Sequence, residues 1–115
     1  MTTALCLSCG STKFGAILRC RHCGAGSCGD PQTDIFFSDH RLTVACLEAL
    51  GSVIRAIAQV ASDPEERFYS FMQYVASREQ SRITLNLSPE LAARCQAVLE
   101  RASPPAVEVE RVPRP

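Results

Sequence analysis

Two copies of the motif Cys-x-x-Cys-Gly stand close together near the start of the chain. The first occupies residues 6–10 and the second residues 20–24, with ten residues between the inner cysteines. In each motif a tight turn brings two thiolates to the same ion, and the glycine allows the backbone conformation that the turn needs. Four such ligands form the closed tetrahedral site typical of structural zinc. We therefore predict one structural Zn²⁺ per chain, bound by Cys6, Cys9, Cys20 and Cys23.

Seven cysteines in 115 residues could form either disulfides or metal sites. The sequence has no charged start followed by an apolar run and a cleavage site, and no apolar stretch long enough to span a membrane. We therefore expect a cytoplasmic protein, in which thiols stay reduced and paired Cys-x-x-Cys motifs bind metal. The odd number of cysteines also leaves no complete set of disulfides. Iron fits four thiolates too and is the alternative to zinc.

Residues 1–29 resemble the short zinc ribbons, in which a brief hairpin separates two Cys-x-x-Cys-Gly motifs. The resemblance implies a hairpin over residues 12–19, with Gly15 available for its turn. A module this small cannot fold on apolar burial alone, so the metal would supply the folding free energy. Zinc ribbons bind nucleic acids, dock proteins or act as scaffolds, so the resemblance leaves the function open. The side chains expected to cover the metal-thiolate cluster are Phe14, Ile17 and Leu18.

Two further residues near the second motif could contact the metal. His22 lies inside the motif, and Cys28 follows Cys23 in a glycine-rich run. The favoured interpretation is that His22 points outward from a turn already supplied with two thiolates. Cys28 is expected to belong to a flexible linker. Four cysteine ligands leave no open coordination position, which argues against metalloenzyme chemistry.

Two amphipathic helices are predicted next. The first begins with Ser38 as its N-cap, and its apolar residues recur at steps of three and four as far as Ala61. The second has Asp63 as its N-cap and Glu66 placed for a capping box. Because the connection is short, the two helices should form an antiparallel hairpin over residues 38–78.

The second predicted helix carries most of the aromatic residues. Core packing is the favoured interpretation of its apolar stripe, and a partner-binding surface is the alternative because interface centres use the same residue types. Tyr69 and Tyr74 should lie at the sides of the stripe, where their hydroxyls can stay wet. The stripe itself consists of Phe68, Phe71, Met72 and Val75.

After the second predicted helix, the spacing of the apolar residues changes. Residues 82–87 alternate polar and apolar side chains, which predicts a strand, and Ser88 caps a helix that runs to Ala102. Cys46 and Cys95 fall on buried helix faces, where free cysteine behaves as a small hydrophobe. The predicted fold class is α+β, mostly helical. Its parts are a zinc ribbon (1–29), a linker with a short strand (30–37), a helical α+β domain (38–102) and a disordered proline-rich tail (103–115).

Residues 82–101 also resemble the first half of ribbon-helix-helix repressors, in which such a strand pairs with its copy in a dimer and enters the major groove. The resemblance implies that Arg82, Thr84 and Asn86 read bases. The resemblance ends after residue 101, because those proteins need a second helix to build the dimer core. This chain continues with Ser103-Pro104-Pro105 instead.

Charge gives little support to nucleic-acid binding. Residues 1–29 carry three cations, Lys13, Arg19 and Arg21, and no carboxylate. Four thiolates on a divalent ion contribute −2, so the net charge of residues 1–29 with the metal bound is about +1. The whole chain has 12 basic and 12 acidic residues. Tight binding to phosphates needs many cationic contacts. Ordinary solvation of these cations is therefore the favoured interpretation.

The sequence predicts a non-enzymatic protein-interaction module, adaptor or regulatory, whose partner is another protein or a second copy of itself. The alternative is a DNA-binding transcriptional regulator or antitoxin-like protein, and the third option is an enzyme of unknown type. No phosphate loop, nucleophile motif, membrane segment or small-molecule site is evident. His22 and His40 are the two histidines, and His40 is expected at the surface.

Overall fold

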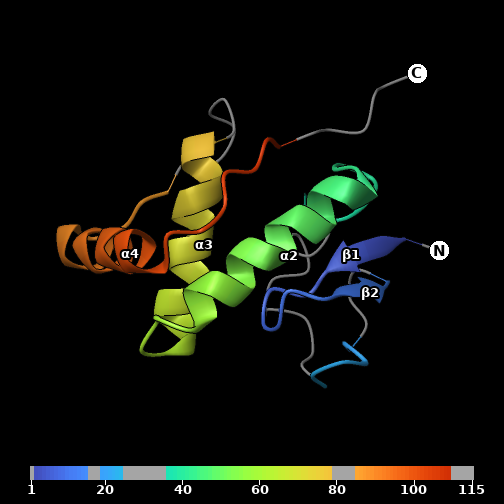
Figure 1. Ribbon diagram of the computed structural model, residues 1–115, viewed down its shortest axis with the longest axis horizontal. Coiled ribbons are helices and arrows are strands. Elements are labelled where there is room, and N and C mark those ends of the chain that lie inside the picture. The colour runs from blue at the N-terminus through green and yellow to red at the C-terminus, as the bar shows by residue number, and fades with distance from the viewer. Residues whose placement is uncertain (1, 16–18, 25–35, 79–84, 110–115) are drawn as a thin grey trace.

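A short sheet precedes three helices in the computed structural model, which describes residues 2–15, 19–24, 36–78 and 85–109 (Figure 1). This architecture confirms the α+β, mostly helical class. In these ranges, no helix has both the length and the apolar character needed to cross a membrane. The elements are β1 (Thr3–Leu5), β2 (Thr12–Phe14), α2 (Val44–Ala58), α3 (Pro64–Arg78) and α4 (Pro89–Ala102).

The sheet is a hairpin that closes around the first cysteine motif. β1 and β2 pair antiparallel with Ala4 opposite Lys13, so residues 6–11 form the connection. The hairpin predicted over residues 12–19 includes residues 16–18, which lie outside the described ranges; the part that the structure describes, β2, pairs with β1 instead of with a described later strand. On its other edge β1 pairs with the chain entering α2: Leu5 N–H donates to Phe37 O over 2.9 Å.

Helix α2 begins five residues later than predicted. Its N-cap is Thr43, whose hydroxyl oxygen accepts from Cys46 N–H at 3.1 Å. Ser38, the predicted cap, instead forms a bridge with Ala4. Its carbonyl accepts the N–H groups of Arg41 and Leu42, both at 2.9 Å, which makes a tight turn. The pairing of Ser38 with β1 thus delays the start of the helix.

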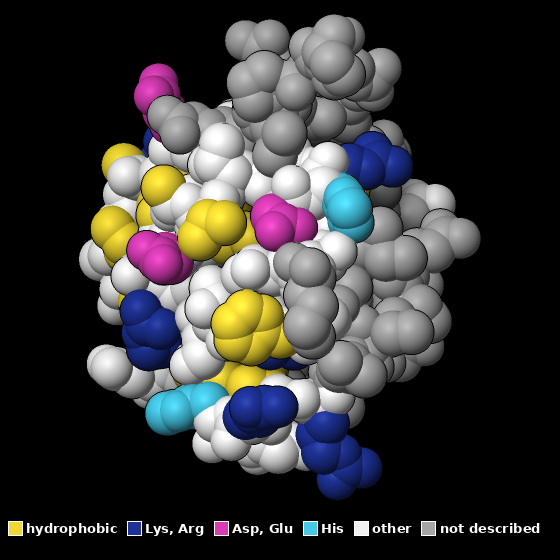
Figure 2. Space-filling view, turned by 90° about the vertical axis from the view of Figure 1, so that its right-hand side faces the viewer, with side chains coloured by type: hydrophobic (Ala, Val, Ile, Leu, Met, Phe, Trp, Pro, Cys, Tyr) yellow, Lys and Arg dark blue, Asp and Glu magenta, His cyan; other side chains and the backbone are white. Residues whose placement is uncertain are grey.

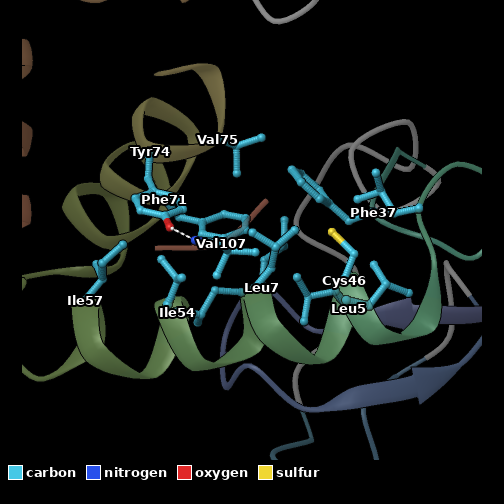
Figure 3. Packing of buried hydrophobic residues seen from close by; sticks show 14 of the residues in the cluster. Leu5, Leu7, Phe37, Cys46, Ile54, Ile57, Phe71, Tyr74, Val75 and Val107 are labelled. Atoms are coloured by element: carbon cyan, nitrogen blue, oxygen red, sulfur yellow. Dashed lines mark hydrogen bonds between the residues drawn. The ribbon is translucent and has the colours of Figure 1, made fainter. Parts of the chain in front are cut away.

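One apolar core joins the N-terminal hairpin to the helices (Figure 3). Leu5 and Leu7 are 0% and 5% exposed and belong to the same cluster as the inner face of α2. Phe37 and Phe71 meet in this core with ring centroids 5.3 Å apart. The cysteine motif therefore rests on the helices through its own Leu7. The predicted boundary between residues 29 and 30 lies outside the described ranges.

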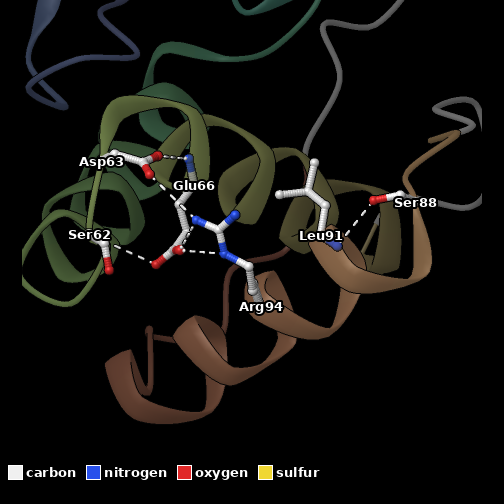
Figure 4. A network of polar contacts seen from close by, with 6 residues as sticks. All are labelled: Ser62, Asp63, Glu66, Ser88, Leu91 and Arg94. Carbon is white, nitrogen blue, oxygen red and sulfur yellow. Dashed lines mark hydrogen bonds and ion pairs between the residues drawn. The ribbon is translucent and has the colours of Figure 1, made fainter.

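A polar network fixes the start of α3 and ties it to α4 (Figure 4). Asp63 caps α3 as predicted, accepting from Glu66 N–H at 2.7 Å. Glu66 reaches back to Ser62 N–H at 3.1 Å, one residue before the cap. Its other oxygen accepts from Arg94 of α4 at 2.7 Å. Ser88 caps α4 as predicted by accepting from Leu91 N–H at 3.2 Å.

This network makes stability depend on pH. The Ser62 N–H first, and then Arg94, lower the pKa of Glu66 below its usual 4.5. Both folded and unfolded chains carry the charge at neutral pH, so the contribution is full there and is lost as pH falls below about 4.5. We expect Glu66→Gln to cost about 1 kcal/mol at pH 7, because it removes the charge that strengthens the hydrogen bonds from Ser62 and Arg94. Urea unfolding of both proteins should show the difference shrinking in acid; a difference that grows there would contradict this assignment.

Tyr74 departs from its predicted place at the wet side of α3. It is 5% exposed, and its hydroxyl donates to Pro105 O at 2.6 Å and accepts from Val107 N–H at 3.0 Å. Val107 is buried in the core, and the Cys46 thiol donates to Glu108 O. The prediction of a disordered tail from residue 103 is therefore wrong as far as residue 109, because the backbone of this segment bonds to Tyr74 and Cys46 and its valine side chains pack on the core.

The predicted strand over residues 82–87 is described only from Leu85 onward. Residues 85–88 have no regular secondary structure and pair with no strand among the described residues. Asn86 is exposed, while Arg82 and Thr84 lie outside the described ranges. Cys46 and Cys95 are buried as predicted, at 3% and 0% exposure.

Candidate metal centre

The two cysteine motifs adopt the same turn. In the first, Gly10 N–H donates to Cys6 O at 2.9 Å, and Gly10 has φ +82°. In the second, Gly24 N–H donates to Cys20 O at 2.8 Å, and Gly24 has φ +77°. Positive φ is strained for residues with a Cβ, so glycine is needed at both positions. The role predicted for the motif glycines is confirmed.

The structure brings the four predicted ligands together. Their sulfur atoms all lie within 4.8 Å of one another. The Sγ atoms of Cys6 and Cys23 are 3.6 Å apart, and those of Cys9 and Cys20 are 3.8 Å apart. A tetrahedron of sulfurs with zinc–sulfur bonds of about 2.3 Å has edges of about 3.8 Å, whereas a disulfide needs about 2.05 Å. The four sulfurs therefore suit a single metal ion and are not disulfide-bonded.

The site formed by the four cysteines is partly buried. Cys6 and Cys20, the first cysteines of their motifs, are 3% and 2% exposed, Cys9 is intermediate and Cys23 is exposed. Burial raises the pKa of the Cys6 thiol to about 12. Burial also acts upward on Cys9, but hydrogen bonds from the backbone and side chain of Ser11 and from neighbouring thiols outweigh it and lower its pKa to about 6. Metal binding by this set therefore entails displacing a proton from at least the Cys6 thiol.

The first motif is seated on α2 by a contact between two glycine backbones. A Cβ at Gly51 would overlap the carbonyl oxygen of Gly10, and a Cβ at Gly10 would overlap the carbonyl oxygen of Gly51. Arg55, one turn further along α2, donates from Nη1 to the same Gly10 oxygen at 3.1 Å. By local propensity alone, Gly51 would only weaken the helix mildly. A glycine in the middle of an otherwise strong helix can indicate that another backbone packs closely against the helix at that position.

The residues predicted to surround the cluster fall into different places. Phe14 is 63% exposed and does not cover the metal site; alternation along β2 points it away from the core. Ile17, Leu18 and Cys28 lie outside the described residues. His22 is exposed, as predicted, and lines a pocket of about 350 Å³ beside Arg55.

His40 is exposed as predicted and takes part in a local contact with the N-terminus. Its Nε2 lies 2.8 Å from the hydroxyl of Thr2. This contact and the pairing of β1 with residues 37–39 hold the first strand against the turn before α2. Among the interactions of the described residues, no carboxylate contacts the ring.

Comparisons with known proteins leave the chain without assigned relatives. No protein-family model, curated protein or solved structure matches it. The clustered cysteines are consistent with a zinc-ribbon-like site able to hold a metal ion. Any functional conclusion therefore rests on the geometry and chemistry of the chain itself.

Proposed function

We propose that this chain is a non-enzymatic protein-interaction module, adaptor or regulatory in role, that is stabilised by one structural Zn²⁺. Thiolates are soft ligands that select zinc or iron among the common metals, and four of them in a tetrahedron complete the coordination of zinc. A closed site of this kind supplies folding free energy rather than a reactive water. The metal ligands are Cys6, Cys9, Cys20 and Cys23.

The observation that carries the interaction role is a groove between the first cysteine motif and α3. Leu7 and Ser8 of the motif line one side, and Phe68 and Tyr69 of α3 line the other, around about 360 Å³. The two aromatic rings meet edge to face with centroids 5.2 Å apart. Aromatic residues are enriched at the centres of protein interfaces, and charged residues at their rims. The remaining lining residues are Pro64, Glu65 and Arg67.

The groove couples partner binding to the metal. Leu7 stands between the two cysteines of the first motif, so its position depends on the turn that the metal holds. Loss of the metal would therefore displace this wall of the groove. Tyr69 is partly exposed in this groove, whereas the buried Tyr74 is engaged with the segment after α4 and is not available to a partner.

Exchange of Tyr69 provides the test. We expect Tyr69→Ala to weaken capture of partner proteins from the native host at least tenfold, because truncation of an aromatic anchor typically costs 2 kcal/mol or more. Quantitative mass spectrometry of captured proteins gives the readout, and the exposed Gln96→Ala on α4 is the matched control. The same proteins should be lost when the metal is chelated. Partners that bind Tyr69→Ala and Gln96→Ala equally well would contradict the proposed docking groove.

A further inference from the structure

Phe14 is the most exposed large apolar side chain in the described part of the chain, at 63%. It lies on β2, where Thr12 and Phe14 share one face and the intervening Lys13 lies on the opposite one and is buried. An aromatic ring on the solvent face of so small a sheet contributes nothing to the core. The ring is therefore accessible to a ligand that can stack on it.

Two cations follow Phe14 within seven residues of the chain. Arg19 and Arg21 are exposed on the segment that carries the second cysteine motif. Thr12, on the same face as Phe14, lines a pocket together with His22 and Arg55. Glu48 is the one carboxylate among that pocket's lining residues. Figure 2 shows the side of the molecule that bears the sheet, with Lys, Arg and His side chains gathered at its lower end and no acidic side chain among them.

Charge is therefore unevenly divided along the neutral chain. Residues 1–29 contain no carboxylate, and the acidic residues belong to the segments that follow. A metal-thiolate cluster would offset two positive charges, so the local excess is small. An anionic partner held by this excess would bind modestly and with strong dependence on salt.

We propose that the face of β2 bearing Phe14 binds single-stranded nucleic acid. The Phe14 ring provides a stacking platform for a base, and Arg19, Arg21 and Arg55 contact the backbone phosphates around it. Stacking on an aromatic ring suits any base, and guanidinium groups recognise phosphate without reading sequence. A protein partner would be expected to bring carboxylates to this face as well as an apolar side chain, and it is the competing outcome. The proposal is independent of the groove at Tyr69, which lies against α3.

The test is fluorescence anisotropy with a labelled oligothymidine of about 12 nucleotides, a length within the usual site sizes. Wild-type protein loaded with zinc should bind with an affinity that falls as salt rises, and three phosphate contacts predict a log–log slope of about −2. Phe14→Ala should weaken binding about tenfold, as loss of one stacked base does. Val44→Ala removes the other large exposed apolar side chain, at 43%, and should leave binding unchanged.

Two charge variants sharpen the assignment. Arg21→Ala should weaken binding and reduce the slope by about 0.7, the share of one phosphate contact. Glu48→Gln should tighten binding by removing the one carboxylate of the adjoining pocket. Circular dichroism and metal content must match wild type for each variant. The proposal is overturned if the wild type shows no salt-dependent binding, if Phe14→Ala and Val44→Ala behave alike, or if Phe14→Ala affects only capture of a protein.

Discussion

Removal of the metal is expected to destabilise the whole described fold, not only the cysteine motifs. Structural zinc contributes apparent binding free energies of about 10 kcal/mol or more, which is comparable with the total stability of a small domain. Leu5 and Leu7 lie in the same core as α2 and α3, so release of the first motif exposes part of that core. We expect Cys20→Ser to lower the free energy of unfolding by more than about 5 kcal/mol, measured by urea unfolding with helical circular dichroism.

Cys95→Ala is the matched control for this result. Cys95 is a buried free cysteine outside the metal site, and its replacement removes a sulfur from the core without removing a ligand. It should keep one zinc per chain by elemental analysis and lose only about 1–2 kcal/mol. Helices that melt at the wild-type temperature in Cys20→Ser would show that the N-terminal part folds independently. A wild-type protein that folds fully without metal would contradict the structural role.

The features that sequence predicts well are those set by residues close together in the chain. Each cysteine motif contains its ligands and its glycine within one turn, so its geometry follows from local chemistry. The caps at Asp63 and Ser88 are equally local, because the capping oxygen and the N–H that it satisfies are three residues apart. These are the elements whose positions the structure confirms.

The errors concern contacts between distant residues. Ser38 has every local feature of an N-cap, but its backbone pairs with Ala4 and the helix starts later. Tyr74 lies at the side of its stripe, but Pro105 and Val107 cover it. β1 is a three-residue strand, too short to show a period of two. Ser38 and Tyr74 are each placed by a partner more than thirty residues away along the chain, and β1 is a strand because the fold brings other segments to its edges.

Gly51 illustrates the same limit and carries the last prediction. In an isolated helix Gly→Ala stabilises by about 1 kcal/mol, because alanine is the better helix former. Here a Cβ would strike the backbone carbonyl of Gly10, which cannot turn aside as a flexible side chain would. We therefore expect Gly51→Ala to destabilise the protein by about 2 kcal/mol, within the usual range for overpacking.

Because the contact holds the first cysteine motif, the same change should also weaken zinc binding, measured by competition with a chromogenic chelator. Ser52→Ala, at the next position, raises helix propensity without meeting Gly10 and should stay within about 0.5 kcal/mol of wild type. Arg55→Ala removes the hydrogen bond to Gly10 O but leaves the glycine contact. It should therefore reduce the zinc affinity less than Gly51→Ala does. A Gly51→Ala protein that is more stable than wild type and keeps its zinc affinity would contradict the role of the Gly10–Gly51 contact in holding the metal site on α2.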